Sequence, residues 1–326
     1  MKTILLPILI LLFIAAGCSD SGVIADFSQH QSAIHNGKEA PDPEYAATIA
    51  IAVQVDDTYR VYCSGVLIDK DIVLTAAHCA SDDAGIPFTK LYQEGKIFVI
   101  TGQKANTPDE SHRFRVDGLS VHPKHSTAHN EHDLALLWIE REVPEEMALP
   151  LPLFKDIDKI KAFEHFHQSI EFSGYGMDEN DQDGFRLTAE GTVMNYCKSG
   201  NETCAVNDPT GEKLIIPEGS IIHDIEKAGP CIGDSGGPVT VTVDGQKYVL
   251  GVTSFGDEYC SVYSVTTTVA DHTAWLESTL SPEHDDDCSI HALPVSKRKY
   301  PGFWLVMLML GGAFWVPLRR KAHSSE

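Results

Sequence analysis

The chain has 326 residues, of which 43% are hydrophobic, and it carries a formal net charge of −22 at pH 7. This length is ample for a substantial hydrophobic core, and the acidic charge argues against nucleic acid as a partner. The chain's 8 cysteines lie at spacings unlike those of metal sites and favour an oxidising compartment. Buried reduced thiols in a cytosolic protein are the alternative.

The N-terminus is typical of an exported protein. Lys2 and the long apolar run that follows it predict a bacterial-type signal peptide over residues 1–17. The run ends in AAGCS (residues 15–19), which resembles a lipoprotein signal in which the cysteine becomes the lipid-bearing first residue. We therefore expect lipid on Cys18, with ordinary cleavage before this cysteine as the alternative. Residues 18–33 are small and polar, as in a short propeptide.

Short β-type runs, broken by turn residues, follow one another through the middle of the chain. The predicted strands fall within residues 49–53, 61–68, 97–101, 113–121, 134–139, 170–175, 191–196, 214–216, 239–243, 248–255 and 262–269. Many short strands at regular spacing predict a β-sandwich or β-barrel. The proline-rich stretch 147–154 is interpreted as the connection between two halves, and residues 270–280 as a terminal helix.

Three motifs that carry chemistry lie in separate parts of the chain, and they are Thr75–Cys79 (TAAHC), His132–Leu137 (HDLALL) and Gly229–Pro238 (GPCIGDSGGP). Paired glycines beside a serine allow a tight turn that exposes the hydroxyl. A serine hydroxyl is a poor nucleophile unless a base takes its proton and a carboxylate orients that base. Ser235, His78 and Asp133 supply these three groups.

The order His, Asp, Ser along the chain distinguishes one class of serine hydrolase from the others. With these motifs, the chain resembles the trypsin/chymotrypsin serine endopeptidases over residues 34–280. The resemblance implies an all-β fold of two packed six-stranded antiparallel β-barrels, formed by residues 34–150 and 151–280. It also implies a C-terminal helix and a site in the cleft between the barrels.

The resemblance implies a role for each residue of the motifs. Ser235 attacks the scissile carbonyl and forms an acyl-enzyme. His78 takes the serine proton and returns it to the leaving amine, while Asp133 holds the imidazole in the right tautomer. The backbone N–H groups of Gly233 and Ser235 form the oxyanion hole. The substrate is a protein or peptide, and no cofactor is expected.

The segment Ile34–Ala40 (IHNGKEA) resembles the activation site of this family, where cleavage frees a new N-terminus. The ammonium group of Ile34 would then pair with buried Asp234 and order the oxyanion hole, since an unpaired buried carboxylate is costly. The cut falls after Ala33, so the implied activating protease is not trypsin-like. A surface loop without processing is the alternative.

The family has disulfides at two places where this chain has matching cysteines. The resemblance implies a bond from Cys63 to Cys79, which pins the loop of His78 to a strand. It also implies a bond from Cys231 to Cys260, which braces the specificity pocket.

Four cysteines remain. Cys197 and Cys204 are near enough in sequence to close a small loop of their own. If Cys18 carries lipid, Cys288 is unpaired; a bond between Cys18 and Cys288 would instead tie the propeptide to the mature chain. The sequence leaves both arrangements open.

Substrate-binding residues follow from the same resemblance. Trypsin-like members place an aspartate where this chain has Gly229, followed by Pro230, so we expect poor cleavage after Arg or Lys. Ser254, Phe255 and Gly256 match the strand that pairs with the substrate backbone. Gly256 leaves the pocket entrance open, which suits an apolar or medium-sized side chain.

Two stretches have the residue types of metal ligands. His122, His125, His129 and His132 precede the aspartate motif, and Glu179–Glu190 partly matches a calcium-loop template. The histidines are interpreted as part of the loop that leads to Asp133, and the acidic stretch as a solvated loop. No metal site is predicted.

The C-terminus has a polar linker (281–300), an apolar run (301–318) and a basic tail (319–326). At about 1.5 Å per residue the apolar run reaches roughly 27 Å, which is just enough to cross a hydrocarbon core. A membrane anchor with a cytoplasmic basic tail is predicted, so that the protease lies in the periplasm or at the cell surface. A sorting tail that is processed after export, and a core helix, are the alternatives.

Two other functions are compatible with the motifs. The first is a catalytically silent homologue that acts as a binding module, against which the complete set of three motif residues argues. The second is esterase action on small acyl substrates, which the same acyl-enzyme chemistry permits.

Overall fold

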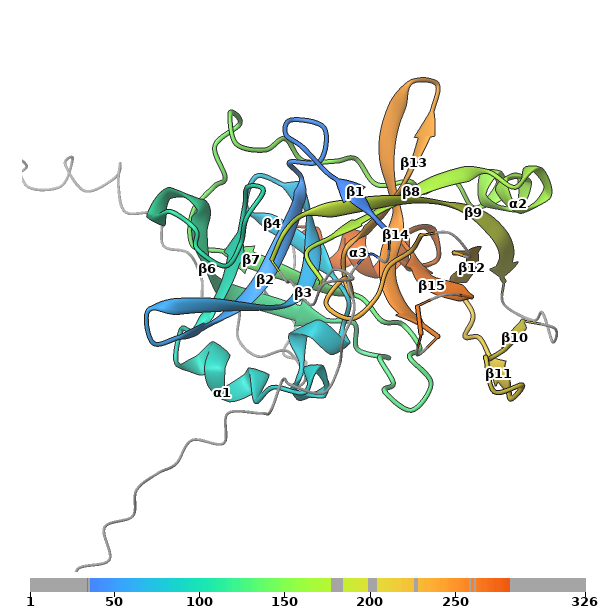
Figure 1. The fold of residues 1–326 in the computed structure, drawn as a ribbon, viewed down its shortest axis with the longest axis horizontal. Helices are drawn as coiled ribbons and strands as arrows, with labels where there is room; N and C mark the ends of the chain where they lie inside the picture. Colours follow the sequence, from blue (N-terminus) through green and yellow to red (C-terminus); the bar gives the residue numbers. More distant parts are fainter. Residues whose placement is uncertain are drawn as a thin grey trace, which may run out of the picture. The chain divides into compact units, whose positions relative to one another are not determined.

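The computed structural model describes residue 34 and residues 36–176, 184–198, 204–225, 228–257, 259–260 and 262–281 (Figure 1). The predicted signal peptide, propeptide, linker, apolar C-terminal run and basic tail lie outside these residues, as do Cys18 and Cys288. Among the described residues, no helix is both long and apolar enough to cross a membrane.

The first half of the chain forms a closed six-stranded barrel. Its strands are β2 (Thr48–Val55), β3 (Thr58–Asp69), β4 (Ile72–Thr75), β5 (Ile97–Ile100), β6 (Arg113–Val121) and β7 (Ala135–Ile139). They are hydrogen-bonded in the order β2-β3-β4-β7-β6-β5, and β5 pairs with β2 to close the barrel. Residues Thr48–Val53 of β2 are all buried, so this strand lies in the interior on both faces.

The second half forms another closed barrel, drawn mainly in yellow-green and orange in Figure 1. Its strands are β8 (Ser169–Gly174), β9 (Leu187–Cys197), β12 (Ser220–Asp224), β13 (Pro238–Val243), β14 (Gln246–Gly256) and β15 (Tyr263–Thr268). The hydrogen-bonded order is β9-β12-β15-β14-β13-β8, and β8 pairs with β9 to close it. The short strand β1 (Lys38–Glu39) adds to β9, and β10 (Ala205–Asn207) pairs only with β11 (Lys213–Ile215).

Each end of the described chain packs on the barrel formed by the other half. Ile34 is fully buried among apolar side chains of the second barrel, such as Phe172 and Ile221. At the other end, helix α3 (Thr273–Leu280) places Trp275 and Leu276 on the core of the first barrel. The two barrels are therefore held together by both terminal segments.

Two further helices lie on the surface. α1 (Phe88–Gln93) buries Phe88 in the first barrel core. α2 (Ile157–Phe166) begins where the Asp156 carboxylate accepts hydrogen bonds from the N–H groups of Asp158 and Lys159. Such a cap satisfies donors that a helix start otherwise leaves unpaired.

The predicted fold is confirmed: the described residues form two six-stranded barrels with antiparallel pairing, followed by a C-terminal helix. Each predicted strand lies on an observed strand. The helices α1 and α2 and the strands β1, β4, β10 and β12 had not been predicted as separate elements.

Candidate active site

The loop that carries Ser235 lies between β12 and β13 and is held from both barrels. The Ser235 carbonyl accepts a 2.8 Å hydrogen bond from the N–H of Ser64 on β3. The N–H of Gly236 donates to the Thr253 carbonyl on β14 at 2.7 Å. Gly236 has a φ of +79°, and a Cβ there would lie 2.0 Å from Thr75 Oγ1. Only glycine fits this close approach between the loop and the first barrel.

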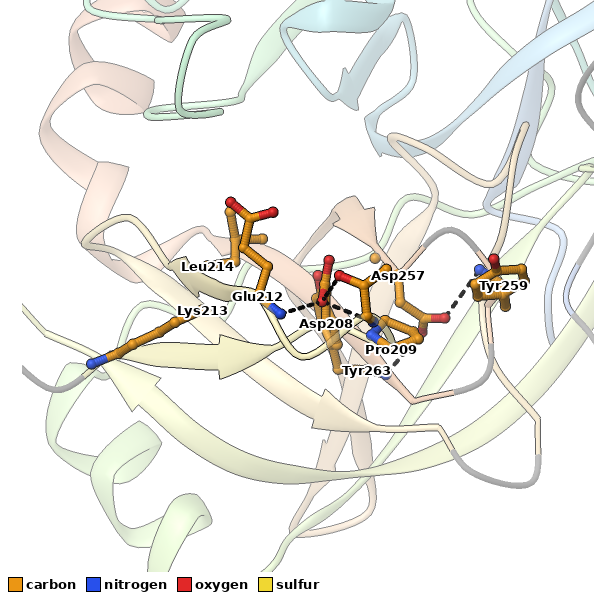
Figure 2. Close-up of a pocket in the computed structure, with 10 residues that line it drawn as sticks. Asp208, Pro209, Glu212, Lys213, Leu214, Asp257, Tyr259 and Tyr263 are labelled. Atoms are coloured by element: carbon orange, nitrogen blue, oxygen red, sulfur yellow. Dashed lines mark hydrogen bonds between the residues drawn. The ribbon is translucent and has the colours of Figure 1, made fainter.

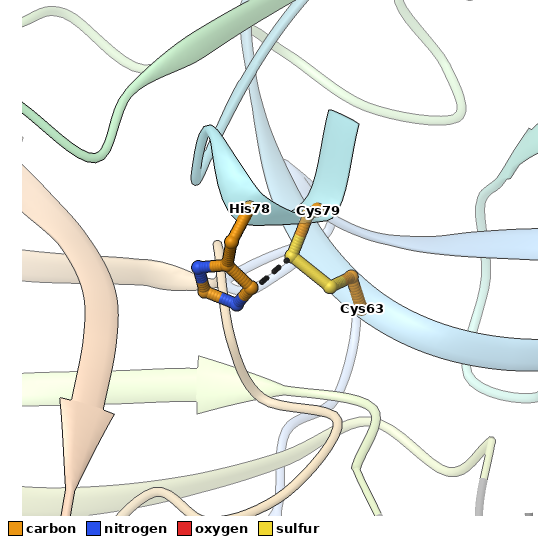
Figure 3. A group of neighbouring side chains, drawn as sticks. All are labelled: Cys63, His78 and Cys79. Atoms are coloured by element: carbon orange, nitrogen blue, oxygen red, sulfur yellow. Dashed lines mark hydrogen bonds between the residues drawn. A yellow bond between two sulfur atoms is a disulfide. The ribbon is translucent and has the colours of Figure 1, made fainter. Parts of the chain in front are cut away.

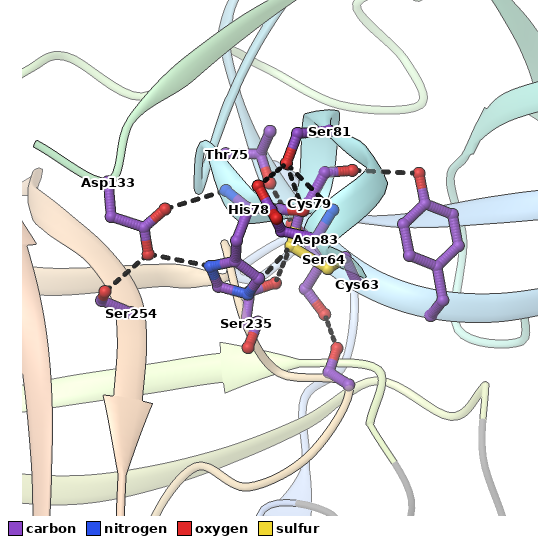
Figure 4. Close-up of a disulfide and its surroundings, with 12 residues drawn as sticks. Cys63, Ser64, Thr75, His78, Cys79, Ser81, Asp83, Asp133, Ser235 and Ser254 are labelled. Atoms are coloured by element: carbon purple, nitrogen blue, oxygen red, sulfur yellow. Dashed lines mark hydrogen bonds and ion pairs between the residues drawn. A yellow bond between two sulfur atoms is a disulfide. The ribbon is translucent and has the colours of Figure 1, made fainter. Parts of the chain in front are cut away.

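His78 and Asp133 are brought together by the pairing of β4 with β7. Thr75, the last residue of β4, lies opposite Ala135 at the start of β7, so the residues that follow one strand and precede the other are neighbours. His78 Nδ1 lies 2.8 Å from Asp133 Oδ2, and the His78 N–H donates to Asp133 Oδ1 at 2.9 Å. Both carboxylate oxygens therefore face the same histidine (Figure 4).

Asp133 is fully buried, and a third donor reaches it from the second barrel. Ser254 on β14 donates to Oδ2 at 2.6 Å. Burial by itself raises the pKa of Asp133, but the charge and hydrogen bonds of His78, together with the Ser254 bond, hold that pKa below its ordinary value. Burial likewise opposes the charged form of His78, and the Asp133 charge outweighs it, so that the pKa of His78 is raised.

Ser235 is half-buried and lies beside the imidazole of His78 in Figure 4. In the described part of the chain, no hydrogen bond joins its hydroxyl to the histidine. Catalytic hydrogen bonds are often loose before substrate binds. Within the same residues, the N–H groups of Gly233 and Ser235 donate to no acceptor, which leaves both available to a substrate oxygen.

All three expected disulfides are present, and they join Cys63 to Cys79, Cys197 to Cys204 and Cys231 to Cys260. The first lies directly beside His78 (Figure 3). Since both sulfurs are bonded to each other, neither is a thiolate that could bind a metal together with the histidine. The bond instead fixes the turn that carries His78 to strand β3.

Asp234 is almost completely buried, next to the candidate oxyanion hole. Its carboxylate accepts hydrogen bonds from the N–H groups of Gly176 at 2.9 Å and Cys231 at 3.0 Å. Burial nevertheless raises the pKa of Asp234 to about 7, against the opposing effect of these two donors. Ile34 is buried in the same barrel, whereas Ala33 and His35 on either side of it lie outside the described residues.

Ser64 was missed by the sequence analysis. It is fully buried, and its hydroxyl donates to the Gly233 carbonyl at 3.0 Å while it accepts from the Tyr175 N–H at 2.9 Å. It therefore connects the nucleophile loop to the end of β8. Only its position after Cys63 could have drawn attention to it.

Two of the predicted specificity residues lie within the loop between β12 and β13, and the other three lie at the end of β14. Gly229 and Pro230 are buried, and a Cβ on Gly229 would lie 2.5 Å from the Cβ of Ile225. Phe255 is half-buried and Gly256 is exposed at the end of β14.

A pocket lies beyond Gly256. The β10–β11 hairpin lines one side of it, and Asp257, Tyr259 and Tyr263 line the other (Figure 2). Its lining residues are Asp208, Pro209, Thr210, Glu212, Lys213, Leu214, Gly256, Asp257, Tyr259 and Tyr263. The exposed end of β14 therefore leads into a hollow built by a hairpin that no strand of either barrel pairs with.

The four histidines between residues 122 and 132 do not form one cluster. His129 is exposed, and His125 Nδ1 lies 3.9 Å from Asp133 Oδ1. His122 and His132 instead meet His272, which follows β15 and lies 140 positions away from His132 in the chain. Burial lowers the pKa of His122 to about 3, with a further contribution from the neighbouring histidines. The pKa values of His132 and His272 are also lowered, chiefly by burial.

The structure describes only part of the acidic stretch Glu179–Glu190. Glu179 to Asp183 lie outside the described residues, and Glu190 is an exposed residue of β9. The interpretation of this stretch as a solvated loop stays a prediction.

Comparison with known proteins gives a consistent result. The family model described as Trypsin matches residues 34–276. A chymotrypsin of Phaedon cochleariae is 26% identical over 251 residues, which are 75% of this chain and 81% of that protein. A collagenase of Hypoderma lineatum is 27% identical over 230 residues, 70% of this chain and 79% of that protein. The solved structure of HL collagenase superposes with a TM-score of 0.58 at 24% identity, covering 76% of this chain and 98% of that chain.

Proposed function

The chain belongs to the trypsin family of serine endopeptidases, and on that premise we propose that Ser235, His78 and Asp133 are its catalytic triad. The observation that carries the proposal is the contact between His78 and fully buried Asp133. Both carboxylate oxygens accept hydrogen bonds from this one histidine, and the serine lies beside its ring. A buried carboxylate with three donors next to a partly exposed imidazole suits general-base catalysis at a serine.

In the proposed mechanism, Ser235 Oγ attacks the scissile carbonyl carbon and its proton passes to His78 Nε2. Nδ1–H of the same ring donates to Asp133, which stabilises the imidazolium that forms. The imidazolium then protonates the leaving amine, and the acyl group stays on Ser235. A water molecule, deprotonated by His78, hydrolyses this ester and restores the enzyme.

Negative charge develops on the substrate oxygen in both steps. The N–H groups of Gly233 and Ser235, which are free of acceptors in the described residues, are proposed to receive it. Removal of one such donor in a comparable enzyme costs about 3–4 kcal/mol of transition-state stabilisation. The Ser64 hydroxyl, through its bond to the Gly233 carbonyl, is proposed to hold the first of these donors in place.

We further propose that cleavage before Ile34 activates the enzyme. Asp234 is buried with a raised pKa, so it has no fully compensating cation among the described residues that contact it. A new ammonium group at Ile34, which is buried in the same barrel, would supply that charge and favour the ionised carboxylate. The oxyanion hole, one residue to either side of Asp234, would then be ordered by processing.

The proposed specificity is for apolar or medium-sized side chains rather than Arg or Lys. Gly229 supplies no charge at the expected pocket base, and Ile225 packs tightly against it. The pocket between the β10–β11 hairpin and Asp257, Tyr259 and Tyr263 is proposed to bind further substrate residues. These residues lie on the same side of the scissile bond as the side chain that enters the specificity pocket.

The three disulfides fit an oxidising compartment, and the N-terminal sequence supports an exported protein. Attachment through lipidated Cys18 or through residues 301–318 remains a proposal that concerns residues outside the described part of the chain.

The proposal is tested with the purified chain on an unfolded protein substrate, with cleavage sites read by mass spectrometry. We expect hydrolysis that Ser235→Ala abolishes, at sites without a preference for Arg or Lys. If the wild-type chain with a free Ile34 N-terminus cleaves neither protein nor ester substrates, the binding-module hypothesis replaces this one. If it turns over esters alone, esterase action does.

A further inference from the structure

Three histidines from distant parts of the chain lie close together, and one of them is the residue before Asp133 of the candidate triad. His122 follows β6, His132 immediately precedes Asp133, and His272 lies in the turn before α3. One nitrogen of each lies within 4.8 Å of the corresponding nitrogen of the other two. His122 and His272 are buried, and His132 is half-buried, so the group is open to solvent on one side only.

We propose that His122, His132 and His272 bind a zinc ion, and that this ion lowers the activity of the peptidase. The binding site stands on the geometry of the three rings. The effect on activity rests in addition on the proposed function of Asp133.

The two best-placed donors are Nδ1 of His132 and Nε2 of His272, which are 3.1 Å apart. A tetrahedral zinc ion with Zn–N bonds of about 2.0–2.1 Å has its ligand nitrogens about 3.3 Å apart. The observed separation is therefore close to one edge of such a tetrahedron. In the metal-free protein, Nδ1–H of His132 donates to Nε2 of His272. On zinc binding, the ring proton of His132 would move from Nδ1 to Nε2.

His272 is oriented by a further contact. Its Nδ1 lies 2.7 Å from the carbonyl oxygen of Thr268 and must donate to it, which leaves the Nε2 lone pair directed at His132. Metal-binding histidines usually donate their second N–H to a carbonyl or carboxylate in this manner, which fixes the tautomer. His272 thus already has the tautomer and second contact of a zinc ligand.

His122 needs the largest adjustment. Its ring stacks on that of His132 with 4.7 Å between centroids and 17° between planes. A shared ion must lie near the plane of each ring, so one ring has to tilt out of the stack. The N–H of Lys124 also donates to His122 Nδ1 at 3.3 Å, and this long bond would be lost when Nδ1 takes the ring proton. The fourth position of the ion would face solvent beside His132 and hold water.

The link to catalysis is the peptide bond between His132 and Asp133. His132 has a φ of +50°, in the left-handed region that non-glycine residues adopt uncommonly. Zinc would fix or shift this residue, and Asp133 moves with it. The ion would also place two positive charges next to the carboxylate that must stabilise the imidazolium on His78. Both effects lower the rate.

The test of binding uses the full chain carrying Ser235→Ala, freed of metal with a chelator and titrated with Co²⁺, whose absorption in the visible reports tetrahedral coordination. We expect one equivalent of Co²⁺ to bind and Zn²⁺ to displace it. Since even outer-shell partners are typically worth about 10- to 100-fold in metal affinity, His132→Gln and His272→Gln should each weaken binding by more than about 100-fold.

The matched control is His129→Gln, an exposed histidine of the same loop, which should bind as the parent does. Far-UV circular dichroism of the metal-free variants shows whether each one folds. If His272→Gln does not fold, His132→Gln, at the half-buried position, decides the outcome. Absence of the Co²⁺ band in the parent chain, or its survival in His132→Gln, overturns the site.

The test of regulation uses the active chain. Micromolar Zn²⁺ should lower its turnover reversibly, a chelator should restore it, and His132→Gln should remove most of the inhibition. Inhibition that persists in His132→Gln would mean that zinc binds elsewhere, for example at His78 itself, and would overturn the regulatory part. Because Co²⁺ binding is measured on the inactive variant, an enzyme without turnover would contradict the proposed function and leave the metal site standing.

Discussion

At the scale of single residues, the candidate site depends on how one buried carboxylate stays charged. Asp133 has no exposed surface, yet it accepts hydrogen bonds from the backbone and ring of His78 and from Ser254. Two of these donors belong to His78, in the turn after β4 of the first barrel, and the third belongs to Ser254, on strand β14 of the second barrel. The charge on Asp133 therefore depends on the two barrels being packed together.

Loss of the Ser254 hydroxyl should slow turnover without abolishing it. Hydrogen bonds to charged groups are worth about 1.5–3 kcal/mol, and only the part that differs between resting and transition states affects the rate. For Ser254→Ala we expect kcat to fall about three- to tenfold with a small change in KM. Ser278→Ala, an exposed serine of α3, is the control. An unchanged kcat in Ser254→Ala would contradict this role.

The pH dependence of kcat/KM follows from His78. The imidazole must be neutral to accept the serine proton, and its pKa is raised by Asp133 above the ordinary histidine value. Activity should therefore rise with pH through a midpoint above about 6.5, while Asp133, with its lowered pKa, stays ionised throughout. A pH–rate profile of the processed enzyme measures this midpoint. A midpoint clearly below the ordinary histidine value contradicts the assignment of His78.

Adding a carboxylate at the pocket base should fail to create a trypsin-like enzyme. In Gly229→Asp the new Cβ would lie 2.5 Å from the Cβ of Ile225, so the side chain cannot enter without a backbone shift. We expect no gain in kcat/KM on Arg or Lys peptides and a lower melting temperature. The double variant Gly229→Asp with Ile225→Ala should recover part of the stability. Efficient cleavage after Arg by the single variant, absent from the parent chain, would show that position 229 can hold a carboxylate at the pocket base and would contradict the steric argument.

Sequence reasoning reached some of these residues and not others, for a physical reason. Ser235, His78 and Asp133 each lie in a local motif whose residue types already imply the chemistry. Ser64 and His272 act through contacts with residues that are 169 and 140 positions away, respectively. Such contacts have no local signal, because they depend on how the strands close into barrels.

At the scale of secondary-structure elements, the pairing of β4 with β7 brings His78 next to Asp133. The Cys63–Cys79 disulfide fixes the turn after β4, which carries His78, to β3. Strands with continuous apolar runs, such as β2, were predictable because both of their faces are buried. α2 was overlooked, although its apolar residues Ile157, Ile160 and Phe163 recur at helical spacing and Asp156 caps its start. Only Ile160 and Phe163 of its ten residues are buried. β12 is short, and its polar residue His223 is buried inside the barrel against Thr266, which hides the strand pattern.

Removal of the Cys63–Cys79 bond should destabilise the protein and loosen the turn of His78. The two cysteines are 16 positions apart, and closure of a loop of about 15 residues is worth about 3 kcal/mol in the chain-entropy model. Cys63→Ala with Cys79→Ala, made in the Ser235→Ala chain, should lose about this much stability in urea unfolding. The matched control removes the Cys197–Cys204 bond, which closes a loop of only 7 positions and should cost less. Equal losses, or none in the first pair, would contradict this.

At the scale of the whole molecule, the two ends of the described chain connect the barrels to the site. Ile34 is buried in the second barrel, and α3 packs on the first while it follows the turn that carries His272. Processing before Ile34 and metal binding at His272 would thus act on the same site from opposite ends of the domain. The first would act through Asp234 on the oxyanion hole, and the second through His132 on the triad.

Labelling by a fluorophosphonate probe, with the modified residue located by mass spectrometry, tests the proposed nucleophile Ser235 and its activation together. It is made on the unprocessed chain, on a chain whose N-terminus is Ile34, and on the Ser235→Ala variant of the latter. We expect a label on Ser235 in the processed chain, little in the unprocessed chain and none in the variant. Equal labelling before and after processing would contradict the activation step, and a processed chain that takes no label at Ser235 would contradict the triad itself.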